Sequence, residues 1–138
     1  MHRIWIDTNI LIDILEGRQP FSEASAKVWE CCEARLAEGY LSALSFMNMV
    51  YAERHQSSPD QVEWVHTIVA KTVNVQGLTA SDLGRAAALG WRDFEDAVQY
   101  VAAKRARADF IITRNGRDFE EEDIPCLTPE EYLQLMAP

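Results

Sequence analysis

The chain has 138 residues, of which 48% are hydrophobic and 25% are charged, and these values are typical of an ordinary globular domain. We therefore expect a single domain over residues 1–138, with one sizeable core. Its 13 basic and 22 acidic side chains give a net charge of −9, which disfavours non-specific binding to nucleic acid, because neutralising phosphates requires a basic face. This charge is compatible with a nuclease whose bound metal ions supply positive charge locally.

The cysteines and the hydropathy of the chain predict a cytoplasmic protein. Cys31, Cys32 and Cys126 are an odd number of cysteines without metal-ligand spacing, so we expect reduced thiols. No segment has the length and apolar character of a membrane span. The first apolar run is interrupted by Asp7 and Asp13, which argues against a signal peptide.

The first predicted strand is the apolar run Ile4–Ile6, which stops at Asp7. A helix is predicted directly after it, because the next apolar residues recur at helical spacing: Ile10, Leu11, Ile14 and Leu15. The remaining predicted elements are, in chain order, a helix over 22–37, a strand over 40–43, a helix over 44–55, a helix from Pro59 capped by Ser58, a strand over 72–75, helices over 81–89 and 93–108, strands over 110–113 and 124–127, and a final helix opening at 128–131. Strands that alternate with helices predict a parallel sheet covered on both faces.

The turn formed by Asp7, Thr8 and Asn9 is the first candidate site. In an open α/β sheet, ligands bind outside the carboxyl ends of the strands, which is where this turn places a carboxylate, a hydroxyl and an amide. The same three residue types also cap helices well, so a purely structural role for Asp7 as a helix cap competes with a functional one.

A second candidate lies at the start of the predicted helix over 93–108. Asp93 and Asp96 are three residues apart and share one helix face, whereas Glu95 is expected to point elsewhere. An aspartate followed by an acid three residues later also resembles a capping box. Ala97 and Val98 place Asp96 beside the buried stripe, where a carboxylate needs a partner or a metal ion.

The third candidate is the polar turn after the strand over 110–113, which contains Thr113, Asn115 and Asp118. A tight Asn-Gly turn followed by a capping aspartate is the structural alternative. Two strand ends and one helix start can thus bring Asp7, Asp96 and Asp118 together. Three such carboxylates repel each other unless a cation lies among them, and oxygen ligands suit Mg²⁺ or Mn²⁺ better than Zn²⁺.

These three motifs, in this order over nearly the whole chain, resemble the PIN-domain ribonucleases, which include the VapC-like toxins of bacterial toxin–antitoxin pairs. The resemblance implies a three-layer α/β/α sandwich with a four- or five-stranded parallel sheet. It also implies that acidic residues hold one or two Mg²⁺ or Mn²⁺ ions and that single-stranded RNA is cut to give 5′-phosphate and 3′-hydroxyl ends. Family members commonly form homodimers and are held by a small antitoxin protein whose segment crosses the active site.

Carried over by position, the resemblance assigns the first, third and fourth family acids to Asp7, Asp96 and Asp118. The supporting polar residues would be Thr8, Asn9, Thr113 and Asn115. The position of the second acid falls on Asn48, a departure that a subset of PIN-like proteins shares.

An amide at position 48 removes one charge from the pocket but keeps an oxygen that can ligate a cation or a water molecule. We expect weaker metal binding, for which Asp93 could partly compensate. Glu53 lies about 500° of helical rotation beyond Asn48 and cannot replace it. Arg114 and Arg117 are the candidates for guiding the RNA backbone, because an acidic surface needs a local basic path.

Two other interpretations compete with a nuclease. One is a catalytically weak or inactive PIN-like module that docks a protein partner, which Asn48 favours. The other is a receiver-type phosphoacceptor, which also clusters aspartates at parallel-strand ends. It is disfavoured because Asp7 has no adjacent acid and Lys104 lies within a predicted helix rather than after a strand.

Overall fold

In the computed structural model, which describes residues 1–52 and 58–138, five parallel strands form one sheet in the order β3-β2-β1-β4-β5. The central strand β1 pairs with both β2 and β4, so it is hydrogen bonded on both sides. The strands are β1 (His2–Ile6), β2 (Ala37–Ser42), β3 (Asn74–Gln76), β4 (Phe110–Ile112) and β5 (Cys126–Leu127).

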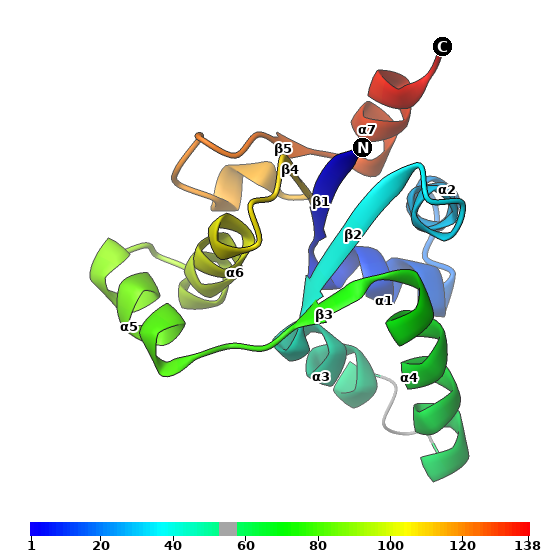
Figure 1. Cartoon of the computed structure of the whole chain (residues 1–138), viewed down its shortest axis with the longest axis horizontal. Coiled ribbons are helices and arrows are strands. Elements are labelled where there is room, and N and C mark those ends of the chain that lie inside the picture. Colours follow the sequence, from blue (N-terminus) through cyan, green and yellow to red (C-terminus); the bar gives the residue numbers. More distant parts are fainter. Residues whose placement is uncertain (53–57) are drawn as a thin grey trace.

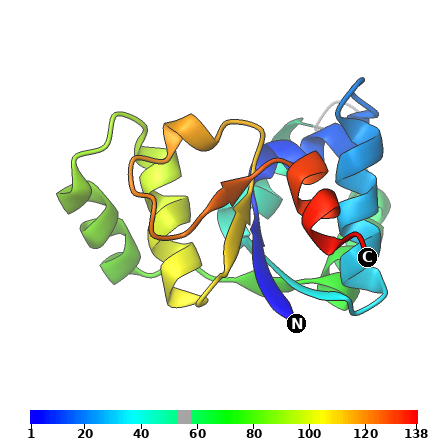
Figure 2. The same ribbon diagram turned by 90° about the horizontal axis from the view of Figure 1, so that it is seen from above.

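Helices cover both faces of this sheet. The described helices are α1 (Thr8–Glu16), α2 (Ser22–Glu33), α3 (Ala43–Ala52), α4 (Pro59–Thr72), α5 (Ala80–Leu89), α6 (Phe94–Arg105), α7 (Pro129–Met136) and the 3₁₀ helix η1 (Gly116–Asp118). Helices α5 and α6 lie on one side of the sheet, whereas α1, α2, α4 and α7 lie on the other (Figures 1 and 2). The predicted three-layer α/β/α sandwich with a parallel sheet is confirmed.

Strand β1 divides the hydrophobic core into two halves. Ile4 and Ile6 point to one face, where they pack with residues of α1, α2 and α7, and Trp5 points to the other face, against α6. The side chains of Ile4 and Trp5 are fully buried and that of Ile6 is 1% exposed. A strand that is buried on both faces reads as a continuous apolar run, which is why this segment was recognisable from sequence.

Local capping signals account for several helix boundaries. Ser58 caps α4 in a capping box with Gln61, as Thr128 caps α7 with Glu131. Gly90 ends α5 in the left-handed conformation, with a φ of 69°. The starts predicted at residues 58 and 128 and the break predicted at residue 90 are therefore confirmed.

Several predicted boundaries were wrong, and two of them have a clear local cause. The helix predicted to reach Ala37 ends at Glu33, because Arg35 adopts a left-handed φ of 60° and Ala37 already pairs with His2 in the sheet. The strand predicted to begin at Thr72 begins two residues later, because the Thr72 hydroxyl donates a hydrogen bond to the Ile68 carbonyl at 2.9 Å and continues the helix.

The helix predicted over 44–55 corresponds to α3, and its expected last turn, with Glu53 and His55, lies outside the described residues. The three cysteines are free thiols, as predicted. No helix in the described part of the chain has the length and apolar character needed to cross a membrane.

Candidate functional site

The strand order fixes the most suitable place for a ligand site. From β1 the chain builds the sheet outwards through β2 to β3 on one side, and β4 and β5 extend it on the other side. In open α/β sheets, ligands bind at the carboxyl ends of the strands where the order reverses in this way, which here is between β1 and β4. Asp7 and Thr113 are the first residues after these two strands, and the Asp7 N–H donates to the Ile112 carbonyl at 3.0 Å.

Asp7 is held rigidly at this position. It is 6% exposed, and its Oδ1 accepts a hydrogen bond from the Thr8 N–H at 2.7 Å while its Oδ2 accepts one from the Thr113 hydroxyl at 2.8 Å. Burial raises the pKa of Asp7 above its ordinary value, against the lowering effect of these two hydrogen bonds. The helix-cap interpretation is thus correct, since Asp7 caps α1, but capping alone does not explain a buried carboxylate with a raised pKa.

The first turn of α6 brings a second set of carboxylates to the same place. Asp93 caps this helix by accepting a hydrogen bond from the Asp96 N–H at 3.0 Å, so its predicted capping role is confirmed. The pKa of Asp96 is raised to about 7, first by burial and then by the charges of Asp7, Asp93 and Asp118. The charge effects on this pKa link the first turn of α6 to Asp7 and Asp118, the two other acids of the predicted site.

The segment after β4 contributes Asp118 from the 3₁₀ helix η1, where its side chain is exposed. The charge of Asp118 raises the pKa values of both Asp7 and Asp96, which places it on the same side of the sheet. The Asn115 N–H donates to the Thr113 hydroxyl at 3.2 Å, so this turn is tied to the group that holds Asp7. The Asn115 side chain is exposed at the rim.

Glu95 makes a contact with α3 that the sequence interpretation missed. It was expected to point away, yet its Oε1 accepts a hydrogen bond from Asn48 Nδ2 of α3 at 3.4 Å. Burial, followed by the charges of Asp7 and Asp93, raises the pKa of Glu95. Helix spacing gave no signal for this contact, because its partner lies on α3, 47 residues earlier in the chain.

A buried chain of hydrogen bonds joins the elements that carry the acids. The Thr8 hydroxyl donates to Ser45 Oγ at 2.8 Å, and Gln99 Nε2 donates to the same oxygen at 3.0 Å. Gln99 Oε1 in turn accepts from the Trp5 indole N–H at 2.7 Å. Ser45, Gln99 and Trp5 are fully buried, so β1, α1, α3 and α6 are fixed relative to one another beneath the acids. Ser45 and Gln99 were not singled out from the sequence.

Asn9 lies beside the carboxylate of Asp7. Its Nδ2 is 3.5 Å from Asp7 Oδ2, and its Oδ1 is buried without a hydrogen-bond partner among the described residues. A buried amide oxygen without a donor is costly unless a ligand or a water molecule satisfies it. Asn9 therefore has an acceptor available for a group bound next to Asp7.

The two candidate arginines differ in their contacts. Arg114 Nη2 donates to Asp13 Oδ1 at 3.3 Å, its Nε lies 2.7 Å from Asp13 Oδ2, and its guanidinium lies 4.3 Å from the centre of the Phe21 ring. Asp13 is fully buried, so Arg114 ties the turn after β4 to α1. Arg117 is exposed on η1. Asp13 was not predicted as a site or structural residue.

The donor set has the chemistry of a site for a hard cation. Its ligand atoms are carboxylate oxygens together with the free oxygen of Asn9, and no arginine, lysine or histidine of the described residues forms an ion pair with Asp7, Asp93, Glu95, Asp96 or Asp118. In the described parts of the chain, no three His, Cys, Asp or Glu side chains are grouped closely enough to hold a metal ion as they stand. The residue types fit Mg²⁺ or Mn²⁺, and burial followed by neighbouring carboxylates raises the pKa values of Asp7, Glu95 and Asp96.

Comparisons with known proteins agree with this architecture. A family profile described as PIN domain matches residues 3–117. A toxin–antitoxin complex from Klebsiella pneumoniae contains a chain that is 25% identical, with a TM-score of 0.69 over 91% of this chain and 97% of that one. VapC20 of Mycobacterium tuberculosis, described as a toxin that cleaves the sarcin-ricin loop, has the same fold at 13% identity, with a TM-score of 0.66 over 83% of this chain and 92% of that one. No curated protein matches significantly. The resemblance inferred from the three motifs is confirmed, and this chain belongs to the PIN domain family.

Proposed function

We propose that this protein is a metal-dependent endoribonuclease that cleaves single-stranded RNA as the toxin of a toxin–antitoxin pair. The observation that carries the proposal is the group of carboxylates at the reversal point of the sheet, where Asp7 and Asp96 have raised pKa values and no cationic side chain of the described residues pairs with them. Perturbed acids of this kind mark functional sites. Membership of the PIN domain family, the likeness to a chain of a toxin–antitoxin complex and the fold shared with VapC20 support the reaction class.

Asp7, Asp96 and Asp118 would hold the Mg²⁺ or Mn²⁺ ion, with Asp93 as a further acid. When bound, such an ion polarises a phosphate oxygen and lowers the pKa of a water molecule that attacks the phosphodiester. The Thr8 N–H and the Thr113 hydroxyl orient the Asp7 carboxylate, because both donate to it, and they lower its pKa against the larger effect of burial. Asp96, with a pKa of about 7, would lose its proton when a cation binds beside it.

Three amide side chains would support the acids. Asn9 has a free oxygen next to Asp7, Asn48 orients Glu95, and Asn115 lies on the turn that is tied to Thr113. Such neighbours fix the orientation of ligating carboxylates and waters. Arg117 is the stronger candidate for guiding the RNA backbone, because it is exposed, whereas the contacts of Arg114 with Asp13 and Phe21 favour a structural role.

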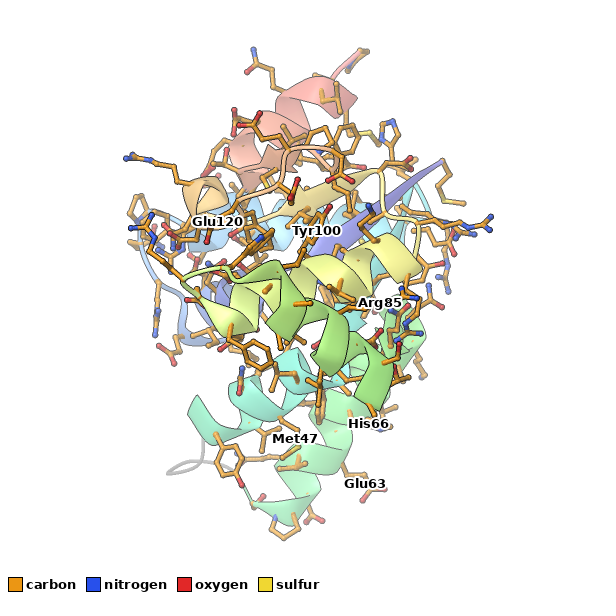
Figure 3. All side chains as sticks on the ribbon, turned by 90° about the vertical axis from the view of Figure 1, so that its left-hand side faces the viewer. Met47, Glu63, His66, Arg85, Tyr100 and Glu120 are labelled. Carbon is orange, nitrogen blue, oxygen red and sulfur yellow. The ribbon has the colours of Figure 1, made fainter. Side chains whose placement is uncertain are left out.

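The partners we propose are a small antitoxin protein and a second copy of the chain, in the cytoplasm. Several large apolar side chains on α3 and α4 are exposed: Met47 at 48%, Tyr51 at 62% and Trp64 at 65%. Figure 3 shows Met47 and His66 on these two neighbouring helices, below α6. Clustered apolar side chains on a surface favour contact with another protein.

Cleavage of a mixed pool of single-stranded RNA in the presence of Mn²⁺ tests the proposal. The native chain should cleave RNA, and Asp7→Asn should lower the rate by at least about 100-fold, since it removes a charge that holds the cation. Asp60→Asn is the matched control, because it removes one exposed aspartate in the first turn of α4, outside the site. Equal rates for native chain and Asp7→Asn would contradict the proposal.

The alternative function is a PIN-like module that docks a partner with little or no catalysis. It is favoured by the amide at position 48, where the family resemblance implies an acid. The same assay separates the two functions, because the docking module predicts no Mn²⁺-dependent cleavage by the native chain at any Mn²⁺ concentration.

A further inference from the structure

Asn48 and Glu95 form a pair that bridges two helices at the mouth of the site. Asn48 lies on α3 and Glu95 in the first turn of α6, and the amide Nδ2 of the first donates to the carboxylate Oε1 of the second at 3.4 Å. These two helices are also joined from below by the buried contact of Gln99 with Ser45 at 3.0 Å. The Asn48–Glu95 pair is therefore a second contact between α3 and α6, which the buried Gln99–Ser45 contact already holds together.

The direction of this hydrogen bond assigns the two roles. An ionised carboxylate only accepts hydrogen bonds, so the Asn48 amide nitrogen must be the donor. A glutamate at position 48 would instead place a second negative charge against Glu95. An amide at this position is thus the residue type that allows a carboxylate of α6 to remain there.

Within residues 1–52 and 58–138, Asn48 is the one side chain that contacts the Glu95 carboxylate through a hydrogen bond or an ion pair. It is an exposed residue on the first turn of a helix, yet its carboxylate does not form an ion pair with any described Lys, Arg or His side chain. Asp93, two residues earlier, already caps the helix by accepting from the Asp96 N–H. Glu95 is therefore not needed for capping, and its carboxylate faces the α3 side of the site.

We propose that Glu95, oriented by the Asn48 amide, supplies the carboxylate that position 48 lacks and is a ligand of the divalent cation. This inference rests on the proposed function. In this assignment, the first turn of α6 provides two ligands for the cation, Glu95 and Asp96. Asp93 stabilises that turn by accepting the hydrogen bond from the Asp96 N–H. Asn48 is then a positioning residue rather than a weakened ligand.

Binding of Mn²⁺ to the RNA-free protein, measured by isothermal titration calorimetry, tests this assignment without relying on activity. Glu95→Gln should weaken Mn²⁺ binding by about 10-fold or more, and Asn48→Ala by a smaller factor, because the carboxylate remains but is less well oriented. Glu63→Gln on α4, labelled in Figure 3 below the site, is the matched control that removes one exposed glutamate charge and should leave binding unchanged.

Moving the carboxylate from position 95 to position 48 tests whether the cation needs a carboxylate between α3 and α6. The double variant Asn48→Glu/Glu95→Gln has the same net charge as the native chain and moves the carboxylate from α6 to α3. If the site needs a carboxylate between these helices, the double variant should recover most of the affinity that Glu95→Gln loses. A purely structural role for the pair predicts no loss in Glu95→Gln in the first place, because the glutamine Oε1 can still accept the hydrogen bond from the Asn48 amide, and there is then no affinity for the double variant to recover.

The failure of this inference is distinguishable from failure of the proposed function. Mn²⁺ binding that is unchanged in Glu95→Gln but abolished in Asp96→Asn would overturn the assignment of Glu95 and leave the nuclease proposal intact. Mn²⁺ binding that is unaffected by either substitution would overturn both.

Discussion

Asp7 and Asp82 are both buried aspartates, but their surroundings shift their pKa values in opposite directions. Asp82, on α5, is 1% exposed and accepts two hydrogen bonds from the Arg105 guanidinium, at 3.1 and 2.7 Å, which hold its pKa below its ordinary value. Asp7 is 6% exposed, and burial raises its pKa, because its neighbours are a hydroxyl, an N–H and further carboxylates. Arg105 neutralises the charge of Asp82, whereas no Lys, Arg or His side chain in the described part of the chain pairs with Asp7.

The same division runs through the molecule. Several acids away from the site have cationic partners, as in the pairs Asp82 with Arg105, Asp123 with Lys104, and Asp13 with Arg114. At the carboxyl ends of β1 and β4, the described residues provide no such partner. Crowded, uncompensated carboxylates lower the stability of the folded state, and a protein retains them where function requires them. Three predictions test this contrast.

The largest effect on stability is expected from Arg114→Met, which leaves the fully buried carboxylate of Asp13 without its closest cation. Removing one partner of a buried ion pair typically costs 3–5 kcal/mol, and we expect about 3 kcal/mol because Arg18 remains 3.9 Å from Asp13. Urea unfolding measures this loss. The control Arg117→Met removes an exposed arginine of the same turn and should change the free energy of unfolding by less than about 0.5 kcal/mol. Equal effects of the two variants would show that the Asp13 contact is not structural.

Changing Asp82 or Asp7 to asparagine should have smaller and opposite effects on the free energy of unfolding. Asp82→Asn loses charge-assisted hydrogen bonds to Arg105 and should destabilise the fold by about 2 kcal/mol. Asp7→Asn keeps a good helix cap and removes a poorly solvated charge, so the free energy of unfolding should stay the same or rise by about 1 kcal/mol. Both are measured by urea unfolding at pH 7.5 without divalent cations. A large loss of stability in Asp7→Asn would mean that its charge is structural.

The sequence was sufficient to predict the layers of the fold and to name the acids of the candidate site, for a physical reason. Strand ends and helix starts are local features, so apolar runs that stop at Asp7 and Thr113 could be recognised without any knowledge of tertiary contacts. The parallel sheet then follows from alternating strands and helices, and parallel strands deliver their carboxyl ends to one edge. Where local geometry competed with the pattern, as at Arg35 with its positive φ, the predicted boundary was wrong.

Residues whose role depends on a distant partner were missed. Asp13 lies three residues after Ile10, so helical spacing alone indicated that it shares the buried face, and this signal could have been used. Its partner Arg114 is 101 residues away, and no local pattern connects them. Gln99 and Glu95 were missed for the same reason, because their partners on β1 and α3 are set by packing rather than by spacing.

The smallest expected effect is a pH dependence of stability that comes from the uncompensated acids. The pKa of Asp96 is raised from its ordinary value of 3.8 to about 7, so between these values the folded chain keeps a proton that the unfolded chain has lost. Stability is therefore highest below pH 4 with respect to this group and falls as the pH rises towards 7. Asp7 contributes with the same sign, since its pKa is also raised, whereas Asp82 has a lowered pKa and acts only at more acidic pH.

Urea unfolding of the native chain and of Asp96→Asn at pH 5 and pH 8, without divalent cations, measures the contribution of Asp96 to the pH dependence of stability. The native chain should lose about 1–2 kcal/mol more than the variant between the two values, which is less than the full shift implies because water screens the partly exposed carboxylate. Adding Mn²⁺ at pH 8 should restore the lost stability to the native chain and much less to Asp96→Asn, because a ligand that binds only the folded state stabilises it. A native chain whose stability between pH 5 and pH 8 changes as that of Asp96→Asn does would show that the site acids are compensated after all, and the contrast between Asp7 and Asp82 would then lose its functional meaning.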